Sequence, residues 1–282
     1  MTITEPASGA TATRSLVTTV RYPTAGAPGG SNVVGATPLR RGGPYPLVVF
    51  SQGFGVSPET YARLLDSWAG AGYVVADPAY PFTSPNSAGG LVRNDIVHHP
   101  ADLSFVITFL LNDRALSGLI DSNKIAVIGH SDGGDVSLAA VANTCCRDAR
   151  VKAAIVLSGA ELSWFKGSYF TSAAVPILVV QGTNDASLNP VACSVELYNQ
   201  APQPKYYLSM IGQSHVSAYV PPGPALGVVT RVTIDFLNGY LRNSASSLVA
   251  MKTTGSVPGL ASLTSQPSLP AVADSCPDAP AG

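Results

Sequence analysis

The chain has 282 residues, of which 46% are hydrophobic and 12% are charged, and its net charge is −1. This length can bury a full core in one α/β domain, and the balanced charge excludes the basic surface that attracts nucleic acid. No apolar run approaches the roughly 18 residues of a membrane-spanning helix. The sequence therefore predicts a globular protein that binds no nucleic acid and does not span a membrane, and we expect a monomer.

The N-terminus and the cysteines bear on the cellular compartment. The first seven residues lack the basic start and the apolar stretch of a secretory signal, so the chain as written is expected in the cytoplasm unless its true start differs. The four cysteines, Cys145, Cys146, Cys193 and Cys276, fit neither a zinc spacing nor a Cys-x-x-Cys motif. They can form two disulfides or be ordinary buried thiols, and the sequence leaves the pairing and the compartment open.

Strand and helix patterns alternate along the chain. Residues 1–14 are rich in Thr, Ala and Ser and are expected to be disordered. The β-branched stretch 15–22 predicts an edge strand, with Val33 and Val34 as a possible second strand. The other predicted strands cover 46–51, 73–77, 125–128, 151–157, 175–180 and 205–210, and the predicted helices cover 58–68, 101–111, 136–142, 189–199 and 225–241.

This alternation predicts the fold class. Strands separated by helices imply a mostly parallel central sheet of about eight strands, covered by helices on both faces, with the N-terminal strand pair as its antiparallel edge. Residues 15–243 would form this domain. Residues 244–282 are rich in Ser, Pro and Ala, and we expect them to be a tail that packs on the domain.

A sharp turn after the strand over 125–128 is the centre of the predicted site. The run from Gly129 to Gly133, Gly-His-Ser-Asp-Gly, matches the Gly-x-Ser-x-Gly pattern, which places Ser131 in a strained turn between a strand and a helix. The helix N-terminus would offer N–H groups to a developing oxyanion. The pattern also occurs by chance, and glycine-rich turns of this kind also bind phosphate. The partners of the serine decide between these interpretations.

A serine hydroxyl needs a nearby base to become a nucleophile, and the chain has four histidines. His98 and His99 precede a helix, where a capping or surface role is expected. The side chain of His130 should point away around the turn. His215 follows the strand over 205–210, in a loop at the sheet edge where ligands bind. His215 is therefore the predicted base.

The histidine needs an acid to fix its tautomer, and Asp185 follows the strand over 175–180 in an equivalent loop. An Asp after Gly-Thr-Asn can also be a plain turn residue. The order Ser131, Asp185, His215 is nevertheless the order of α/β-hydrolases. It differs from the orders found in the two well-known serine protease folds.

The oxyanion hole is predicted to use two backbone N–H groups. One belongs to Asp132, directly after the nucleophile, and the other to Phe54, in the loop after the strand over 46–51. A carboxylate beside a developing negative charge would oppose catalysis. We therefore expect the Asp132 side chain to point away from the oxyanion or to be paired.

With these segments in this order, the sequence resembles the α/β-hydrolase superfamily from about Val20 to Asn243. It is most similar to the serine esterases grouped with dienelactone hydrolases, platelet-activating-factor acetylhydrolases and bacterial cutinase-type polyester hydrolases. Dienelactone hydrolases use a cysteine where this chain has Ser131. The resemblance is carried by the segments 46–54, 71–77, 129–134, 175–185 and 212–215.

In the polyester hydrolases an aromatic residue and a tryptophan flank the bound acyl group, and the resemblance implies that Phe54 and Trp164 do so here. Trp164 can equally be a plain aromatic of the core or surface. Two departures stand out: those enzymes usually carry Met at the position of Asp132, and some have a disulfide for which Ser217 and its neighbours offer no cysteine.

The 53 residues between Ser131 and Asp185 (185 − 131 − 1) leave no room for a large helical lid. The leading hypothesis is therefore an open, metal-free and cofactor-free carboxylic ester hydrolase acting through an acyl-enzyme on short-chain or accessible esters. Polyesters are an alternative substrate, and amides are not excluded. A non-catalytic binding protein on the same fold is the rival of another class.

Overall fold

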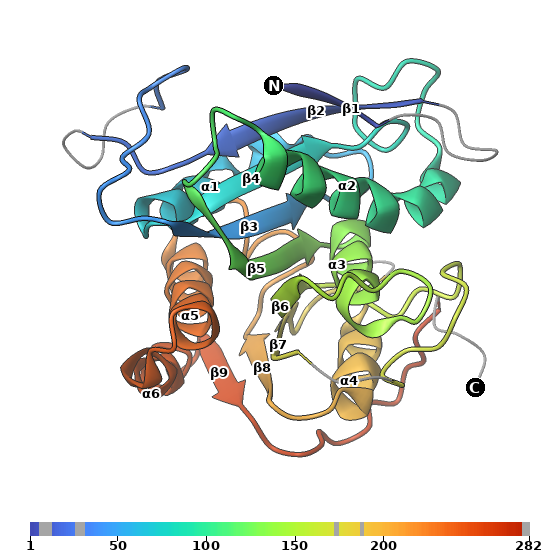
Figure 1. Ribbon diagram of the computed structural model, residues 1–282. Coiled ribbons are helices and arrows are strands. Elements are labelled where there is room, and N and C mark those ends of the chain that lie inside the picture. The colour runs from blue at the N-terminus through green and yellow to red at the C-terminus, as the bar shows by residue number, and fades with distance from the viewer. Residues whose placement is uncertain (6–12, 26–31, 172–174, 187–188, 278–282) are drawn as a thin grey trace.

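A computed structural model shows one nine-stranded mixed sheet with helices on both faces (Figure 1). The structure describes residues 1–5, 13–25, 32–171, 175–186 and 189–277. The six central strands run parallel in the order β4-β3-β5-β6-β7-β8, while β1 and β2 extend one edge and β9 the other in antiparallel pairing. The strands are β1 (Thr2–Glu5), β2 (Arg14–Arg21), β3 (Tyr45–Ser51), β4 (Val74–Ala79), β5 (Ile120–His130), β6 (Val151–Leu157), β7 (Ile177–Gly182), β8 (Lys205–Met210) and β9 (Ala261–Thr264). The predicted α/β-hydrolase fold is confirmed.

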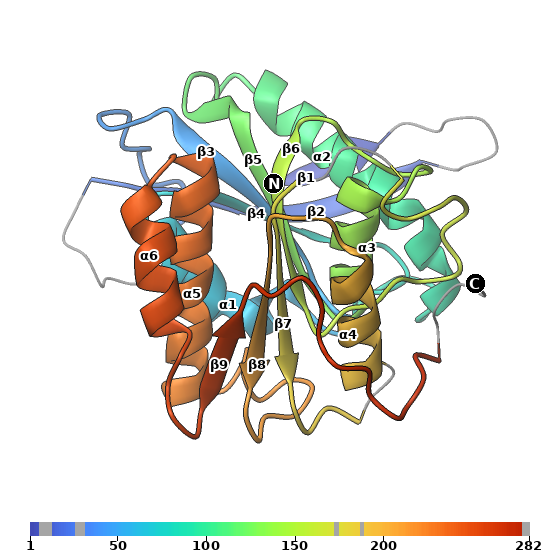
Figure 2. The same ribbon diagram turned by 90° about the horizontal axis from the view of Figure 1, so that it is seen from below.

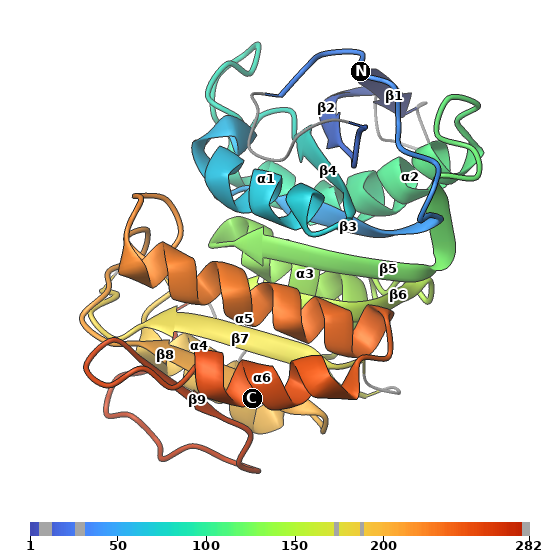
Figure 3. The ribbon, with the colours of Figure 1, turned by 90° about the vertical axis from the view of Figure 1, so that its left-hand side faces the viewer.

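The helices form two layers, one on each face of the sheet (Figure 2). One layer holds α1 (Ala62–Gly70), α5 (Pro224–Leu241) and α6 (Ala245–Thr254), and the other holds α2 (His99–Asn112), α3 (Asp132–Ala142) and α4 (Val191–Gln200). Short 3₁₀ turns over Pro58–Tyr61 and Arg93–His98 precede α1 and α2. Figure 3 shows α5 lying along the sheet with α6 beside it. None of the helices in the described ranges is long and apolar enough to cross a membrane.

The central strands are buried on both faces, which explains their uninterrupted apolar sequences. In β5, Ile125 and Val127 enter the core under α2, α3 and α4, whereas Ala126 and Ile128 enter the core under α1 and α5. Successive strand residues point to opposite faces, so a strand covered on both sides must be apolar at every position. The two cores therefore hold the carboxyl ends of the parallel strands at one rigid edge.

The N-terminal expectations need two corrections. Thr2–Glu5 forms β1 and pairs with β2, so the prediction of disorder is wrong for this stretch, while residues 6–12 lie outside the described residues. Val33 and Val34 are not a strand but exposed turn residues, with 71% and 102% of their surface accessible. The antiparallel edge pair therefore exists, with β1 in the place predicted for the second strand.

The C-terminal segment contains two elements that the sequence did not predict. The helix α6 packs on α5, and β9 pairs with β8, so residues 245–264 extend the sheet and one helical layer. The sequence did not predict α6 because Met251 is the only buried residue of this helix. A single buried position gives no apolar periodicity to detect. How the chain divides into domains stays a prediction.

The four cysteines form two disulfides, Cys145–Cys146 and Cys193–Cys276. The second bond joins the C-terminal segment to α4 across 83 residues of sequence. Asn199, at the end of α4, also accepts a hydrogen bond from the N–H of Leu269 at 2.7 Å. The end of the described chain is therefore fixed against α4 by covalent and polar contacts.

A buried cluster of charges joins β1, β2 and α2. Arg14 is 7% exposed and donates to Asp102 at 2.7 Å and to Asp95 at 2.6 and 2.9 Å. Burial, together with a hydrogen bond to Asp102 and repulsion from it, raises the pKa of Glu5 from 4.5 to about 7. Between about pH 4.5 and pH 7, the native state thus holds a proton on Glu5 that the unfolded chain releases.

We predict that Glu5→Gln removes this pH dependence. Because the folded pKa of Glu5 is raised, its stabilising contribution is present below about pH 4.5 and is lost as the pH rises through about 7. The variant should gain free energy of unfolding relative to the parent on going from pH 4.5 to pH 8, as measured by urea denaturation. A constant difference between the two proteins at both pH values would contradict the prediction.

Candidate active site

Ser131 occupies the tight turn between β5, which ends at His130, and α3, which begins at Asp132. Its φ of 56° is a left-handed conformation that residues with a side chain rarely adopt. A Cβ atom at Gly129 would lie 1.9 Å from the carbonyl oxygen of Gly133, and one at Gly133 would lie 2.0 Å from that of Ser51. Both glycines are therefore required by backbone contact, and the strand-turn-helix context predicted for the serine is present.

Asp185 and His215 come together from two neighbouring loops, Asp185 after β7 and His215 after β8. The Nδ1 atom of His215 lies 2.7 Å from Oδ2 of Asp185. Because the ionised carboxylate can only accept, Nδ1 carries the proton, and Nε2 is left with its lone pair. Asp185 is 5% exposed, so the acid is inside the protein. The structure thus joins the two residues that the sequence proposed as acid and base.

His130 does not point away from the site, contrary to the sequence prediction. It is 1% exposed, its Nε2 lies 2.7 Å from the carbonyl oxygen of His215, and its Nδ1 lies 2.8 Å from the hydroxyl of Tyr61. A carbonyl only accepts, so Nε2 donates and the Tyr61 hydroxyl donates to Nδ1. The neighbour of Ser131 in sequence therefore contacts the main chain of His215, which brings the histidine loop beside the nucleophile turn.

The environment of His130 keeps it neutral. Burial, with a smaller contribution from the nearby His215, lowers the pKa of His130 to about 3. The sequence missed this role because a histidine inside the Gly-x-Ser-x-Gly pattern gives no signal of its direction. His99 is also buried rather than on the surface: its ring stacks on Tyr80 at 4.1 Å between centroids, away from the acid–base pair.

The loop after β3 passes directly beside Ser131. A Cβ atom at Gly53 would lie 3.3 Å from Cβ of Ser131 and 3.5 Å from Nδ1 of His130, so only glycine allows this approach without displacement. Phe54 follows Gly53 in this loop. Asp132 is the first residue of α3, where an N–H group has no acceptor within the helix. Both predicted oxyanion donors therefore lie on segments that touch the serine, and their role stays a prediction.

The Asp132 carboxylate is paired, as the sequence argument required. Arg93 donates to it from Nε at 3.0 and 3.2 Å and from Nη2 at 2.8 Å. The guanidinium carbon of Arg93 also lies 5.0 Å from the ring centroid of Trp164. Arg93 thus bridges Asp132 and the predicted substrate-flanking tryptophan. Nothing in the sequence pointed to Arg93, because it lies 39 positions from Asp132, at the start of the 3₁₀ turn over Arg93–His98.

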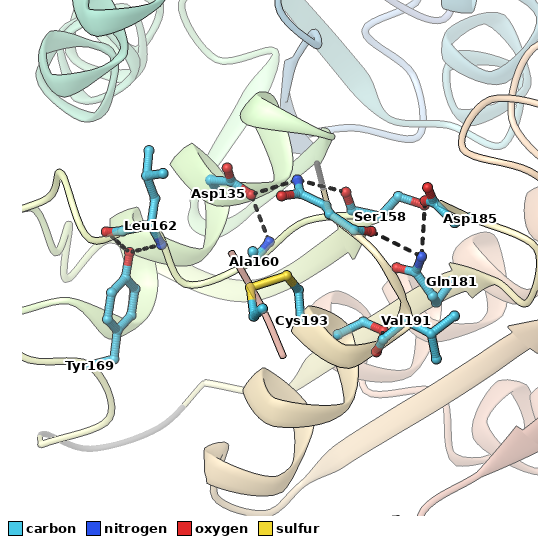
Figure 4. The surroundings of a disulfide bond; sticks show 12 residues. Asp135, Ser158, Ala160, Leu162, Tyr169, Gln181, Asp185, Val191 and Cys193 are labelled. Carbon is cyan, nitrogen blue, oxygen red and sulfur yellow. Dashed lines mark hydrogen bonds between the residues drawn. A yellow bond between two sulfur atoms is a disulfide. The ribbon is translucent and has the colours of Figure 1, made fainter. Parts of the chain in front are cut away.

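The buried side of Asp185 is polar. Figure 4 shows Gln181 beside Asp185, and Nε2 of Gln181 lies 2.9 Å from Oδ2, the same oxygen that His215 contacts. The sequence did not single out Gln181, since a lone glutamine at a strand end carries no motif. Across the described ranges, no group of three or more His, Cys, Asp or Glu side chains is arranged to hold a metal ion.

Comparison with known proteins gives matches over most of the chain. A family model described as PET hydrolase-like matches residues 41–246. Cutinase 2 of Thermobifida cellulosilytica is 26% identical over 210 residues, covering 72% of this chain and 71% of that protein. Cutinase cut1 of Thermobifida fusca is 26% identical over 210 residues, which cover 72% of this chain. The match spans 59% of the length of that cutinase, which is less than two thirds.

A solved structure supports the fold. The ferulic acid esterase from Streptomyces cinnamoneus has a TM-score of 0.68 with this chain at 22% sequence identity. The match covers 88% of this chain and 90% of that one. At this identity the likeness establishes the shared architecture, within which the loops after β5, β7 and β8 carry the side chains described above.

Proposed function

The chain belongs to the PET hydrolase-like family, and we propose that it is a serine carboxylic ester hydrolase acting through an acyl-enzyme on Ser131. The observation that carries the proposal is the 2.7 Å contact between Asp185 and His215, held beside the strained Ser131 turn by His130. This arrangement supplies a base, and an acid that orients the base, next to a half-buried turn serine.

In the proposed mechanism, the Ser131 hydroxyl attacks the ester carbonyl while Nε2 of His215 takes its proton. Asp185 keeps Nδ1 protonated and stabilises the imidazolium. The N–H groups of Phe54 and Asp132 hold the oxyanion of the tetrahedral intermediate. His215 then returns the proton to the leaving alcohol, and a water molecule activated by the same histidine hydrolyses the acyl-enzyme.

The acyl group is proposed to lie between Phe54 and Trp164. Arg93 fixes Trp164 from one side by its cation–π contact, and Arg93 is in turn fixed by Asp132. The described residues between Ser131 and Asp185 are taken up by α3, β6, β7 and their connections, which supports a cleft without a large lid. That the protein is a monomer and binds no nucleic acid stays a prediction.

A second candidate, hydrolysis of aromatic polyesters, is favoured by exposed apolar side chains beside the loop after β3, which passes Ser131. The Leu91 side chain lies 3.4 Å from the position that a Cβ atom at Gly55 would take. The N–H of Val92 donates to the carbonyl oxygen of Phe82 at 2.7 Å. These three side chains and Val216, next to His215, are all exposed. Such a rim suits an apolar polymer surface better than a small soluble ester.

The catalytic assignment is tested with Ser131→Ala. Removing the nucleophile should lower kcat for a p-nitrophenyl butyrate ester by a factor on the order of 10⁴ or more, with the fold retained by circular dichroism. Ser67→Ala, which removes a hydroxyl from α1, is the matched control and should keep the parent rate. An undiminished rate in Ser131→Ala would reject the proposal, and a panel of acyl lengths and an anilide would define the substrate class.

The polyester candidate is tested with a Leu91→Gln and Val92→Gln double variant on an aromatic polyester film. Product release from the film should fall several-fold, because the apolar contact with the polymer is lost. Hydrolysis of the soluble ester should fall much less. Val249→Gln, an equally conservative change at an exposed position of α6, should leave both rates unchanged. Equal losses on the film and on the soluble ester would contradict a surface-binding role.

The pairing of Asp132 leads to a double-mutant prediction. Arg93→Met leaves the Asp132 carboxylate without this cation next to the oxyanion, so kcat should fall by about 10- to 100-fold. In Asp132→Met that charge is absent, and adding Arg93→Met should then cost little. The measurement is a double-mutant cycle on kcat. Additive losses in the double variant would show that Arg93 acts independently of Asp132.

A further inference from the structure

Gln181 lies behind the proposed catalytic acid, at the end of β7, and is 1% exposed. Its Nε2 donates to Oδ2 of Asp185 at 2.9 Å and lies 3.3 Å from the carbonyl oxygen of Asn189. The same Oδ2 accepts from Nδ1 of His215 at 2.7 Å. One carboxylate oxygen therefore receives a donor from His215 and a second donor from Gln181, and Figure 4 shows the Gln181 contact.

The chemistry of its neighbours fixes which end of the amide faces Asp185. Both groups near the nitrogen, a carboxylate and a carbonyl, only accept, so an amide oxygen in that place would be repelled. In the described part of the chain, Oε1 of Gln181 has no hydrogen-bond partner. Gln181 also lines a cavity of about 280 Å³ together with Val191 and Val195 of α4. The amide is thus held through its NH₂ end.

A chain of polar contacts fixes Gln181 relative to the nucleophile helix. Asn189, whose main-chain carbonyl contacts Gln181, donates from its side-chain amide to the carbonyl oxygen of Ser158 at 3.0 Å and to Asp135 at 3.3 Å. Asp135 lies in the first turn of α3 and accepts from the N–H of Ala160 at 2.6 Å. The support of Asp185 is therefore built on the helix that begins directly after Ser131.

We propose that Gln181 is a positioning residue that sets the orientation and charge distribution of Asp185, and through it the proton affinity of His215. The inference rests on the proposed function. A donor to a buried carboxylate favours its charged form, and it withdraws part of the negative charge from the oxygen that faces the imidazole. Without this donor, Oδ2 should bind the His215 proton more strongly, and the acid should be less well held.

The first test is Gln181→Met, which keeps the length of the side chain but removes the donor. We expect kcat to fall about tenfold with KM changed by less than about twofold, because a hydrogen bond to a charged group is lost while the substrate contacts remain. The acid limb of the pH profile of kcat/KM should move to higher pH, since the imidazolium of His215 then faces a more negative oxygen. A packing role alone would lower thermal stability without moving this limb.

The second test is Gln181→Glu, which nearly preserves the shape and makes the donor depend on pH. When protonated, the new carboxyl can donate its O–H to Asp185; when ionised, it repels Asp185 at hydrogen-bond distance. Two carboxyls this close share a proton and titrate as a pair. We expect activity to fall as the pH rises through the range where the pair ionises, giving a falling limb that the parent lacks.

The other titratable groups around the pair do not produce such a limb. His130 has a pKa of about 3 and stays neutral, and burial raises the pKa of Tyr207 to about 12. Burial also raises the pKa of Tyr219. Asp135 lies beyond Asn189 and is unchanged by the substitutions. The titration introduced by Gln181→Glu can therefore be assigned to the 181–185 pair.

Gln200→Glu is the matched control, because it makes the same chemical change at the exposed end of α4 and should keep the parent pH profile. All variants are also titrated with an organophosphate that labels the active serine. The Gln181 variants should label to the same final extent as the parent but more slowly, which separates a slowed site from a misfolded fraction.

The outcomes separate this inference from the proposed function. If Ser131→Ala remains active or is labelled, the proposed function is overturned and this inference with it. If Ser131→Ala is inactive while Gln181→Met and Gln181→Glu keep the parent kcat and pH profile, the positioning role alone is overturned. If Gln181→Met loses kcat with no movement of the acid limb, Gln181 contributes packing only, which also overturns it.

Discussion

The contact on which the site depends is the close approach of three backbone segments around Ser131. The Gly129 and Gly133 positions meet within the turn itself, and Gly133 also meets the carbonyl of Ser51 at the end of β3. Any side chain at Gly133 would separate α3 from β3 and remove the first helical N–H from the serine. The strained φ of Ser131 persists because both strands and α3 are held by the buried cores on either face.

Around this turn, each charge near the reacting centre has a defined partner. Arg93 pairs with Asp132, so the charge of the carboxylate next to the proposed oxyanion position is compensated. Asp185 is satisfied by His215 and Gln181, and His130 is kept neutral by burial. The site therefore contains one mobile proton, the one that the proposed mechanism passes between Ser131 and His215. Fixed partners reduce the reorganisation needed when charge develops during the reaction.

Much of this arrangement could be predicted from the sequence, and the failures have physical causes. Continuous apolar runs located the central strands, and order along the chain selected Ser131, Asp185 and His215. Pattern could not reveal residues whose role comes from tertiary contact alone, such as Arg93, Gln181 and the inward-facing His130. It also missed β1, α6 and β9, because short edge elements with little buried surface carry weak periodicity. The partners of the cysteines could not be deduced from their spacing.

The Cys193–Cys276 bond has a consequence for the integrity of the enzyme. The bond closes a covalent ring of sequence that contains β8, His215, α5, α6 and β9. The proposed base and the outer elements α6 and β9 therefore lie inside this ring. A single cut by a protease anywhere within the ring would leave the two fragments joined. One backbone cleavage would therefore not allow the segment that carries His215 to diffuse away from the rest of the protein.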